Sequence, residues 1–106
     1  MSLRKLRVEI TLPRFYKNGK KIEDEKFLET DTELRKSFGG CERMPNFEGT
    51  WISSSGKVYA DRNQGFKVDV PNKNESLSFI KQYKGKLERR FDQDEIYIIA
   101  YEIYKI

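Results

Sequence analysis

Two pairs of aromatic residues are the side chains of this chain best suited to bind a flat ligand: Trp51 with Tyr59, and Tyr97 with Tyr101. Exposed rings of this kind stack on nucleobases or on small aromatic molecules. All of them lie in segments rich in strand-forming residues, where aromatic side chains also commonly fill a core. The sequence therefore leaves a ligand-stacking and a core interpretation open for both pairs.

The other reactive side chains argue against several kinds of catalysis. The chain contains no histidine, which excludes histidine-dependent triads and removes a ligand of most zinc sites. Cys41 is the only cysteine, and only Arg43 is close enough in sequence to activate it, so a small, partly buried cysteine is favoured over a reactive thiol. The spacing of the carboxylates matches no known metal-binding loop. We predict no catalytic residue, no metal and no cofactor, and we lean against an enzyme.

The length and composition indicate one globular domain that covers residues 1–106. Charged residues make up 36% of the chain, apolar residues 37% and aromatic residues 13%, which suits a single core without disulfides or metal. A lone cysteine cannot form an intramolecular disulfide, which fits an intracellular protein. No apolar run approaches the roughly 18 residues of a membrane span, and the N-terminus lacks the apolar region of a secretory signal. We expect a cytoplasmic protein with no membrane partner.

The formal net charge of +4 permits binding to nucleic acid. Basic residues crowd residues 4–21, but an acidic block at 23–33 follows directly, and the two can neutralise each other in the fold. A solvated surface is therefore favoured over a nucleic-acid footprint. If nucleic acid does bind, we expect contacts from Arg4, Lys5, Arg7, Lys17, Lys20, Lys21, Lys81, Lys84, Arg89 and Arg90.

The first half of the chain predicts a strand and a helix. Residues 6–12 alternate apolar and polar side chains, which is typical of a strand with one buried face. Phe27, Leu34 and Phe38 then recur at helical spacing, behind acidic residues that favour a helix start. Gly39-Gly40 predicts the end of this helix, because glycine adopts the left-handed conformation of a C-cap at little cost.

The second half predicts a hairpin, a helix and a last strand. Residues 48–59 read as two strand segments around a Ser-Ser-Gly turn, and residues 66–70 continue with a half-buried strand. Residues 62–65 form either a bulge within one long strand or a turn, and we favour the bulge. Asn72 and Glu75 resemble a capping box at the start of a second helix. Its apolar stripe is predicted at Leu77, Ile80, Leu87 and Phe91, with Tyr83 beside it. Residues 96–106, dense in β-branched and aromatic side chains, predict the last strand.

This β-α-β-β-α-β order predicts a ferredoxin-like α+β sandwich, an antiparallel sheet with two helices on one face. In that arrangement the first and third strands are central and the last strand lies at an edge.

The last strand is unusual for an edge, because residues 96–106 carry apolar side chains on both faces. Natural proteins cover or blunt long apolar edges, and most soluble oligomers are symmetric homodimers. We therefore predict a homodimer. The alternative is that loops of the same chain cover these residues.

Four short motifs carry a resemblance to known proteins: Phe38-Gly39-Gly40, Gly49-x-Trp51, Lys57-Val58-Tyr59-x-Asp61 and Phe91-Asp92-Gln93-Asp94-Glu95. Over nearly its whole length the chain is similar to a group of short, uncharacterised microbial and mobile-element proteins. That group has no established activity, so the resemblance supports the fold and transfers no function. If these positions mark a site, the resemblance points to Trp51, Tyr59, Asp61 and Gln93, with Arg43 as an anion contact.

Two functions follow from these observations. The first is a small dimeric binding or regulatory module that holds a small polar ligand or meets a protein partner at its edge. The second is nucleic-acid binding through the basic residues named above.

Overall fold

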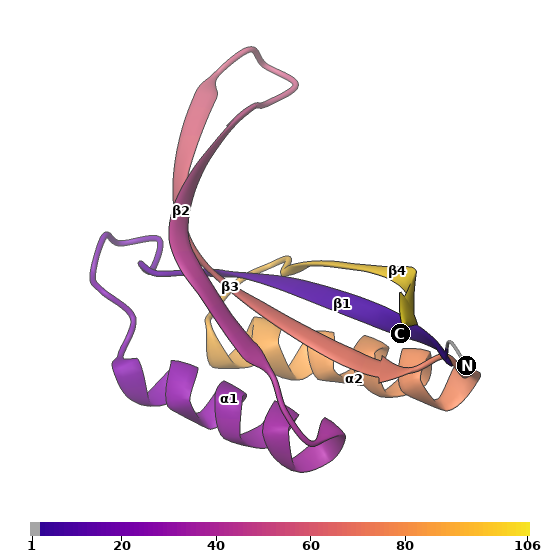
Figure 1. Ribbon diagram of the computed structural model, residues 1–106. Helices are drawn as coiled ribbons and strands as arrows, with labels where there is room; N and C mark the ends of the chain where they lie inside the picture. The colour runs from indigo at the N-terminus through magenta and orange to yellow at the C-terminus, as the bar shows by residue number, and fades with distance from the viewer. Residues whose placement is uncertain (1–2) are drawn as a thin grey trace.

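The computed structural model describes residues 3–106 and has the predicted order of elements. These are β1 (Leu3–Pro13), α1 (Asp24–Phe38), β2 (Glu42–Ile52), β3 (Val58–Pro71), α2 (Asn74–Arg90) and β4 (Tyr97–Lys105). The strands form one antiparallel sheet in the order β2-β3-β1-β4, and both helices lie on one face of it (Figure 1). The ferredoxin-like fold is thus confirmed, with β1 and β3 central and β4 at an edge.

The core lies between the sheet and the two helices. Alternate residues of the central strands face it and are buried, as the period of two predicts: Leu6, Val8, Ile10 and Leu12 from β1, and Phe66, Val68 and Val70 from β3. Helix α1 contributes Phe27 and Leu34, which confirms its predicted stripe. Helix α2 contributes Ser76, Ile80, Tyr83 and Leu87, which recur at helical spacing. The prediction was wrong for Leu77, which is 48% exposed because it lies about 100° around the helix from Ser76.

Two predicted element ends are wrong and one is confirmed. Helix α2 begins at Asn74 behind Lys73, without a side-chain cap, because Asn72 donates instead to Glu102 Oε1 on β4 at 3.0 Å. The predicted capping box therefore does not form. Strand β2 begins at Glu42, earlier than predicted, because it already pairs there with Lys67 of β3. The end of α1 is confirmed: Gly39 has a φ of 89° and donates its N–H to the carbonyl of Arg35 at 2.8 Å.

Strand β3 runs without a break through residues 62–65, which confirms one long strand, but the bulge that we favoured at these residues is wrong, because β3 keeps a regular register with β1 there. The irregularity lies in its neighbour β2, where the register shifts between Arg43 and Asn46. At this point β2 passes close over Gly65, since a Cβ there would lie 3.1 Å from Cβ of Met44. Glycine at position 65 thus makes room for the displaced segment of β2.

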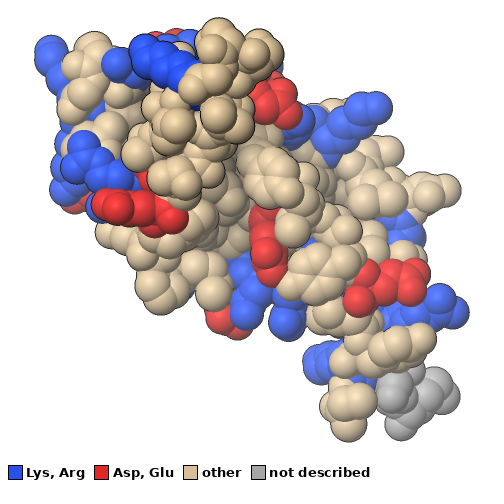
Figure 2. Space-filling model, turned by 90° about the horizontal axis from the view of Figure 1, so that it is seen from above, with Lys and Arg blue, Asp and Glu red and all other residues tan. Residues whose placement is uncertain are grey.

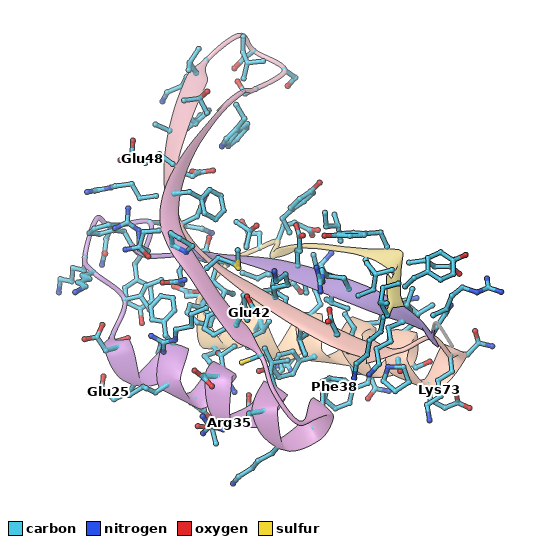
Figure 3. The ribbon with its side chains drawn as sticks, in the orientation of Figure 1. Glu25, Arg35, Phe38, Glu42, Glu48 and Lys73 are labelled. Atoms are coloured by element: carbon cyan, nitrogen blue, oxygen red, sulfur yellow. The ribbon has the colours of Figure 1, made fainter. Side chains whose placement is uncertain are left out.

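The β2-β3 hairpin extends beyond the rest of the sheet. Strand β1 pairs with β3 only as far as Pro13 opposite Asn63, whereas β2 and β3 stay paired out to Ile52 opposite Val58. We call residues 47–62 the arm. It rises from the sheet with no helix beside it, and its side chains project on both sides (Figures 1 and 3). The radius of gyration is accordingly 14.9 Å, against about 13 Å for a compact chain of this length.

The face of the sheet that the helices leave open is polar at its centre and apolar along β4 (Figure 2). At the centre, the guanidinium of Arg7 donates two hydrogen bonds to Asp69, at 2.8 and 3.0 Å. Along β4, Tyr97 and Ile99 are exposed on this face, while Tyr104 is exposed on the opposite one. The predicted edge strand with apolar side chains on both faces is therefore confirmed.

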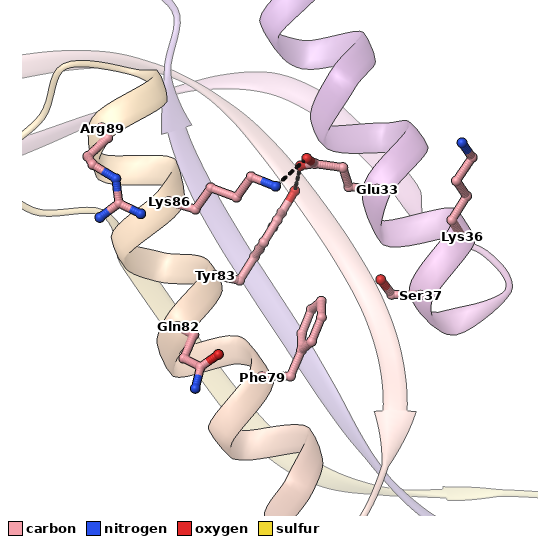
Figure 4. Close-up of a pocket in the computed structure, with 8 residues that line it drawn as sticks. All are labelled: Glu33, Lys36, Ser37, Phe79, Gln82, Tyr83, Lys86 and Arg89. Atoms are coloured by element: carbon pink, nitrogen blue, oxygen red, sulfur yellow. Dashed lines mark hydrogen bonds and ion pairs between the residues drawn. The ribbon is translucent and has the colours of Figure 1, made fainter.

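A buried ion pair joins the two helices. The Arg90 side chain is only 7% exposed, and its Nη2 lies 2.7 Å from Glu33 Oε1 and 3.3 Å from Glu29 Oε1. Glu33 also accepts from Tyr83 and pairs with Lys86 (Figure 4). Burial alone would raise the pKa of Glu33, but the hydrogen bonds from Lys86, Arg90 and Tyr83 together lower that pKa below its usual value. Glu33 therefore stabilises the fold as a carboxylate.

We predict that Glu33→Gln lowers the free energy of unfolding by about 2 kcal/mol, because it leaves Arg90 without its closest carboxylate. Glu29→Gln is the matched control. The Glu29 side chain is 58% exposed, so its loss should cost under about 1 kcal/mol. Urea denaturation of both variants measures the difference, and equal values would contradict this account of the ion pair.

The pH dependence follows from the same carboxylate. A lowered folded-state pKa contributes stability that is present above the unfolded-state pKa of about 4.3 and is lost as pH falls through the folded-state value. The wild-type protein should therefore lose more stability than Glu33→Gln between pH 5 and strongly acidic pH, as measured by thermal unfolding. Parallel curves would contradict this assignment.

Candidate functional site

A cavity of about 550 Å³ lies at the base of the arm. It is bounded by the end of β1 and the loop that follows, by Tyr59–Asn63 of β3, and by Gln93, Glu95, Ile96 and Tyr97 at the entry to β4. We call it the arm-base cavity. It exists because β1 stops while β3 continues, so that the space beside β3 is left without a neighbouring strand.

The local sequence explains why β1 stops here. Proline has no N–H to donate and is therefore uncommon inside a central strand, and Pro13 is the last residue of β1. The last backbone hydrogen bond between the two segments runs from the Arg14 amide to the Arg62 carbonyl at 2.9 Å. The chain then turns back, with Tyr16 N–H bonded to the Lys20 carbonyl at 2.8 Å and Gly19 at a φ of 86°.

The structure brings together four of the five residues that the sequence singled out. Tyr59, Asp61 and Gln93 line the arm-base cavity. Trp51 borders it: its ring stacks on Tyr59 with a centroid separation of 4.6 Å, and its Nε1–H donates to Asp61 Oδ2 at 2.8 Å. Arg43 lies elsewhere, with Nε 3.6 Å from Asp31 Oδ2 on α1, so it joins β2 to that helix.

The polar side chains of the cavity keep unused hydrogen-bonding capacity. Asp61 uses Oδ2 for Trp51, which leaves Oδ1 as an acceptor. Gln93 donates from Nε2 to the Phe91 carbonyl at 3.1 Å, which leaves its Oε1 free. Within residues 3–106, the amide of Asn63 makes no side-chain hydrogen bond. The cavity thus offers at least two acceptors and one amide that can both donate and accept.

The free edge of β3 adds backbone groups to the site. In an antiparallel ladder, alternate residues direct their N–H and C=O groups to opposite sides. Arg62 directs its carbonyl away from β2, towards Arg14, and so Ala60 directs its N–H and C=O to the same side. Strand β1 no longer runs there, and Ala60 lines the cavity. These two backbone groups are therefore available to a bound molecule.

Sequence reasoning missed several lining residues, chiefly Phe15, Arg62 and Asn63. Arg62 stacks on Phe15, with Cζ 3.8 Å from the ring centroid. Pro13 is the sequence signal that could have indicated these residues. It predicts that β1 ends early, and a strand that ends beside a longer one leaves a space lined by the residues that follow it. Tyr97 also lines the cavity, whereas its predicted companion Tyr101 donates to Glu9 on the open face of the sheet.

The surroundings of Cys41 disfavour a reactive thiolate. Burial, together with the nearby Asp31 carboxylate, raises the pKa of this thiol to about 11. It is half-buried, and its Sγ lies 3.6 Å from Asp31 Oδ1. Within the described part of the chain, no three metal-ligating side chains come together, and neither helix is long and apolar enough to cross a membrane.

The basic residues considered for nucleic-acid binding lie in three separate places. Arg4, Lys5 and Arg7 belong to β1, and Lys17, Lys20 and Lys21 lie in the loop beyond its other end. The rest lie on α2, on the far side of the sheet. Several are already paired: Lys84 with Glu95 at 2.6 Å, Arg90 with Glu33, and Arg7 with Asp69.

A second cavity, of about 500 Å³, lies between α1 and α2 (Figure 4). Phe79 and Tyr83 form its floor, and Lys36, Lys86 and Arg89 lie at its rim. Its one carboxylate, Glu33, is engaged by Lys86 and Tyr83. None of the five residues singled out from the sequence lines this groove.

Comparisons with known proteins establish the fold. No protein-family model matches the chain, and no curated protein sequence matches it. Among solved structures, a phage SAM lyase in complex with S-methyl-5'-thioadenosine is similar with a TM-score of 0.66 and 12% identity, over 95% of this chain and 90% of the lyase. CutA1 from Oryza sativa gives 0.65 and 14%, over 96% of this chain and 82% of that protein. The divalent ion tolerance protein CutA1 from Ehrlichia chaffeensis gives 0.61 and 12%, over 97% and 83%. At these identities the likeness shows a shared ferredoxin-like fold.

We predict that Asp61→Ala changes the emission of Trp51, the only tryptophan, because the indole N–H loses its acceptor. Both side chains are exposed, so the free energy of unfolding should change by less than about 1 kcal/mol. Glu48→Ala, which removes a carboxylate from the same arm without a contact to Trp51, is the control. An unchanged spectrum in Asp61→Ala would contradict the hydrogen bond on which the geometry of the site depends.

Proposed function

We propose that this protein is a self-associating binding module that holds a small, flat, polar ligand of the nucleoside type in the arm-base cavity. The observation that carries the proposal is the convergence of Tyr59, Asp61 and Gln93 on one cavity, beside the stacked ring of Trp51. Tyr59 and Asp61 come from the middle of the chain and Gln93 from its C-terminal part, and the early end of β1 opens the space between them.

The chemistry of the walls supports a flat heteroaromatic ligand. Phe15, Tyr59 and Tyr97 supply aromatic surface, on which bases stack with a gain of about 1–3 kcal/mol each. Asp61 and Gln93 offer acceptors for exocyclic amines or ribose hydroxyls, and Asn63 can both donate and accept. A cavity with apolar walls and a few polar groups is the usual form of a small-molecule site.

The likeness to the phage SAM lyase suggests a probe. That protein was solved with S-methyl-5'-thioadenosine, which is a nucleoside. The likeness by itself concerns the fold, so it transfers neither the ligand nor the lyase reaction. It does make this compound and adenosine reasonable first molecules to test.

The exposed apolar surface supports self-association. On the arm, Trp51, Ile52 and Val58 are 51%, 66% and 67% exposed, and on β4 Tyr97 and Tyr104 are 64% and 65% exposed. A two-stranded hairpin is marginal by itself in water, and edges of this kind attract other chains. A second copy of the chain is the simplest partner for these surfaces, since it carries the same apolar residues on its own arm and its own β4. We take the assembly to be a homodimer.

Nucleic-acid binding is less well supported, because its basic residues are dispersed and partly paired. A fluorescence anisotropy titration at low salt separates the two functions: phosphate-driven affinity is strongest there and falls steeply as salt rises. Binding of an oligonucleotide through several sites at once would favour the alternative.

We predict that S-methyl-5'-thioadenosine or adenosine produces a saturable change in Trp51 fluorescence, because the ligand ring enters beside Tyr59. Gln93→Ala should weaken binding about tenfold, the effect of one lost hydrogen bond of about 1.4 kcal/mol. Gln82→Ala, the same change at an exposed position on α2 that does not line the arm-base cavity, should bind as the wild type does. If calorimetry and fluorescence both show no binding at millimolar nucleoside, the ligand class is wrong.

We predict that light scattering on a sizing column gives a dimer at micromolar concentration. A double substitution of Ile52→Lys and Tyr104→Lys should shift the protein to monomer, because it places charge in both apolar surfaces. Lys20→Glu and Lys81→Glu, on exposed positions away from those surfaces, form the control. A wild-type protein that is only monomeric at micromolar concentration would contradict the self-association.

A further inference from the structure

We infer that the ligand of the arm-base cavity carries an anionic group, a phosphate or a carboxylate, joined to its flat ring, and that Arg62 binds this group. The inference rests on the proposed function and narrows it from a neutral nucleoside to an anionic one. It comes from the cations that surround Phe15.

The position of Arg62 suits an anion. Its Cζ lies 3.8 Å from the centroid of the Phe15 ring, and both residues line the cavity. A guanidinium that lies over a ring at this distance gains cation–π energy and loses much of its freedom. Its N–H groups then lie around the edge of the stack, in the fork that pairs with a carboxylate or a phosphate through two hydrogen bonds.

The protein provides no internal partner for this charge. Among the described residues Arg62 makes no ion pair, although Glu48 lies opposite it across the strand pair. Of the other charges around the cavity, Lys17 pairs with Asp94 at 3.0 Å and Glu95 pairs with Lys84, whereas Asp61 accepts from the neutral indole of Trp51 and keeps its negative charge. Arg62 is therefore the cation of the cavity that is left for an external anion.

A second guanidinium lies near the same ring. Cζ of Arg14 is 5.8 Å from the Phe15 centroid, and its Nε is buried without a hydrogen-bond partner among residues 3–106. Two cations beside one ring, neither of them in an ion pair among residues 3–106, favour an anion over a cationic ligand next to Phe15.

The anion and the ring can belong to one small molecule. Arg62 lines the same cavity as Tyr59 and Asp61, although its side chain points to the opposite face of β3, because successive side chains of a strand alternate. A ligand whose ring lies beside Tyr59 and Asp61 therefore needs a linker, such as a ribose, that passes the free edge of β3 to place its charged group at Arg62.

The test compares adenosine, adenosine 5'-monophosphate and adenosine 5'-carboxylic acid by calorimetry and by Trp51 fluorescence. We expect the monophosphate to bind the wild-type protein at least about tenfold more tightly than adenosine. In Arg62→Gln the two should bind within about twofold of each other, at the affinity that adenosine has for the wild type. Lys81→Gln, which makes the same change in net charge on the outer side of α2, should retain the full preference. The carboxylic acid tells whether one negative charge is enough or a phosphate is required.

Each outcome bears on a different claim. Equal affinity of the wild-type protein for adenosine and its monophosphate overturns the inference and leaves the proposed function standing. A preference that survives in Arg62→Gln also overturns it, because general electrostatics would then be the cause. No binding of any of the three compounds contradicts the proposed function itself. If Arg62→Gln does not fold, Arg62→Lys serves instead: it keeps the charge but loses the planar fork, and should lose part of the preference.

Discussion

The early end of β1 is the constraint on which the other features of this structure depend. Strand β1, which is central in the sheet, ends at Pro13 while β3 beside it continues. The continuing part of β3 has only β2 as a neighbour, which turns the hairpin into a free arm. The loop after Pro13 must then turn back, and it carries Phe15 against the exposed side of β3. The arm, the cavity and the unpaired guanidinium all follow from that one mismatch in strand length.

The same mismatch would link the proposed ligand binding to the proposed self-association. A hairpin that leaves its sheet gains nothing from the core of its own domain, and the exposed Trp51, Ile52 and Val58 show how much apolar surface it retains. Because Trp51 also stacks on a wall of the cavity, anything that packs on the arm changes the surroundings of the ligand, and the reverse holds as well. Thermodynamic linkage makes such an effect reciprocal. A regulatory role would arise in this way, because the ligand cavity and the self-association surface share the stacked rings of Trp51 and Tyr59.

Much of the fold could be predicted from the sequence, because its signals are local. The alternation of Leu6 to Leu12, the glycine after Phe38 and the apolar density of the last strand each depend on a few neighbouring residues, and each was correct. The predictions that were wrong concern residues whose contacts depend on parts of the chain that are distant in sequence. Asn72 could cap α2, but it bonds instead to Glu102, thirty residues away. Leu77 could belong to the core stripe, but the rotation of α2 against the sheet buries Ser76 in its place.

The residues of the candidate site also divide into those that the sequence could bring together and those that only the fold brings together. Trp51, Tyr59 and Asp61 lie on one hairpin, so their proximity is nearly fixed by the chain, and Gln93 joins them through the fold. Arg43 was set apart from them by the register shift in β2 and by its contact with Asp31. Arg62 and Phe15 could not be paired from the sequence, because they come from segments that meet only where β1 ends.

The most direct measurement of the central claim is a map of amide chemical shifts by NMR, recorded as adenosine 5'-monophosphate is added to the labelled protein. The account predicts shifts centred on residues 59–63, with Phe15 and Gln93, at the base of the arm. Shifts centred instead on Lys36, Gln82 and Lys86, in the groove between the helices, would contradict it.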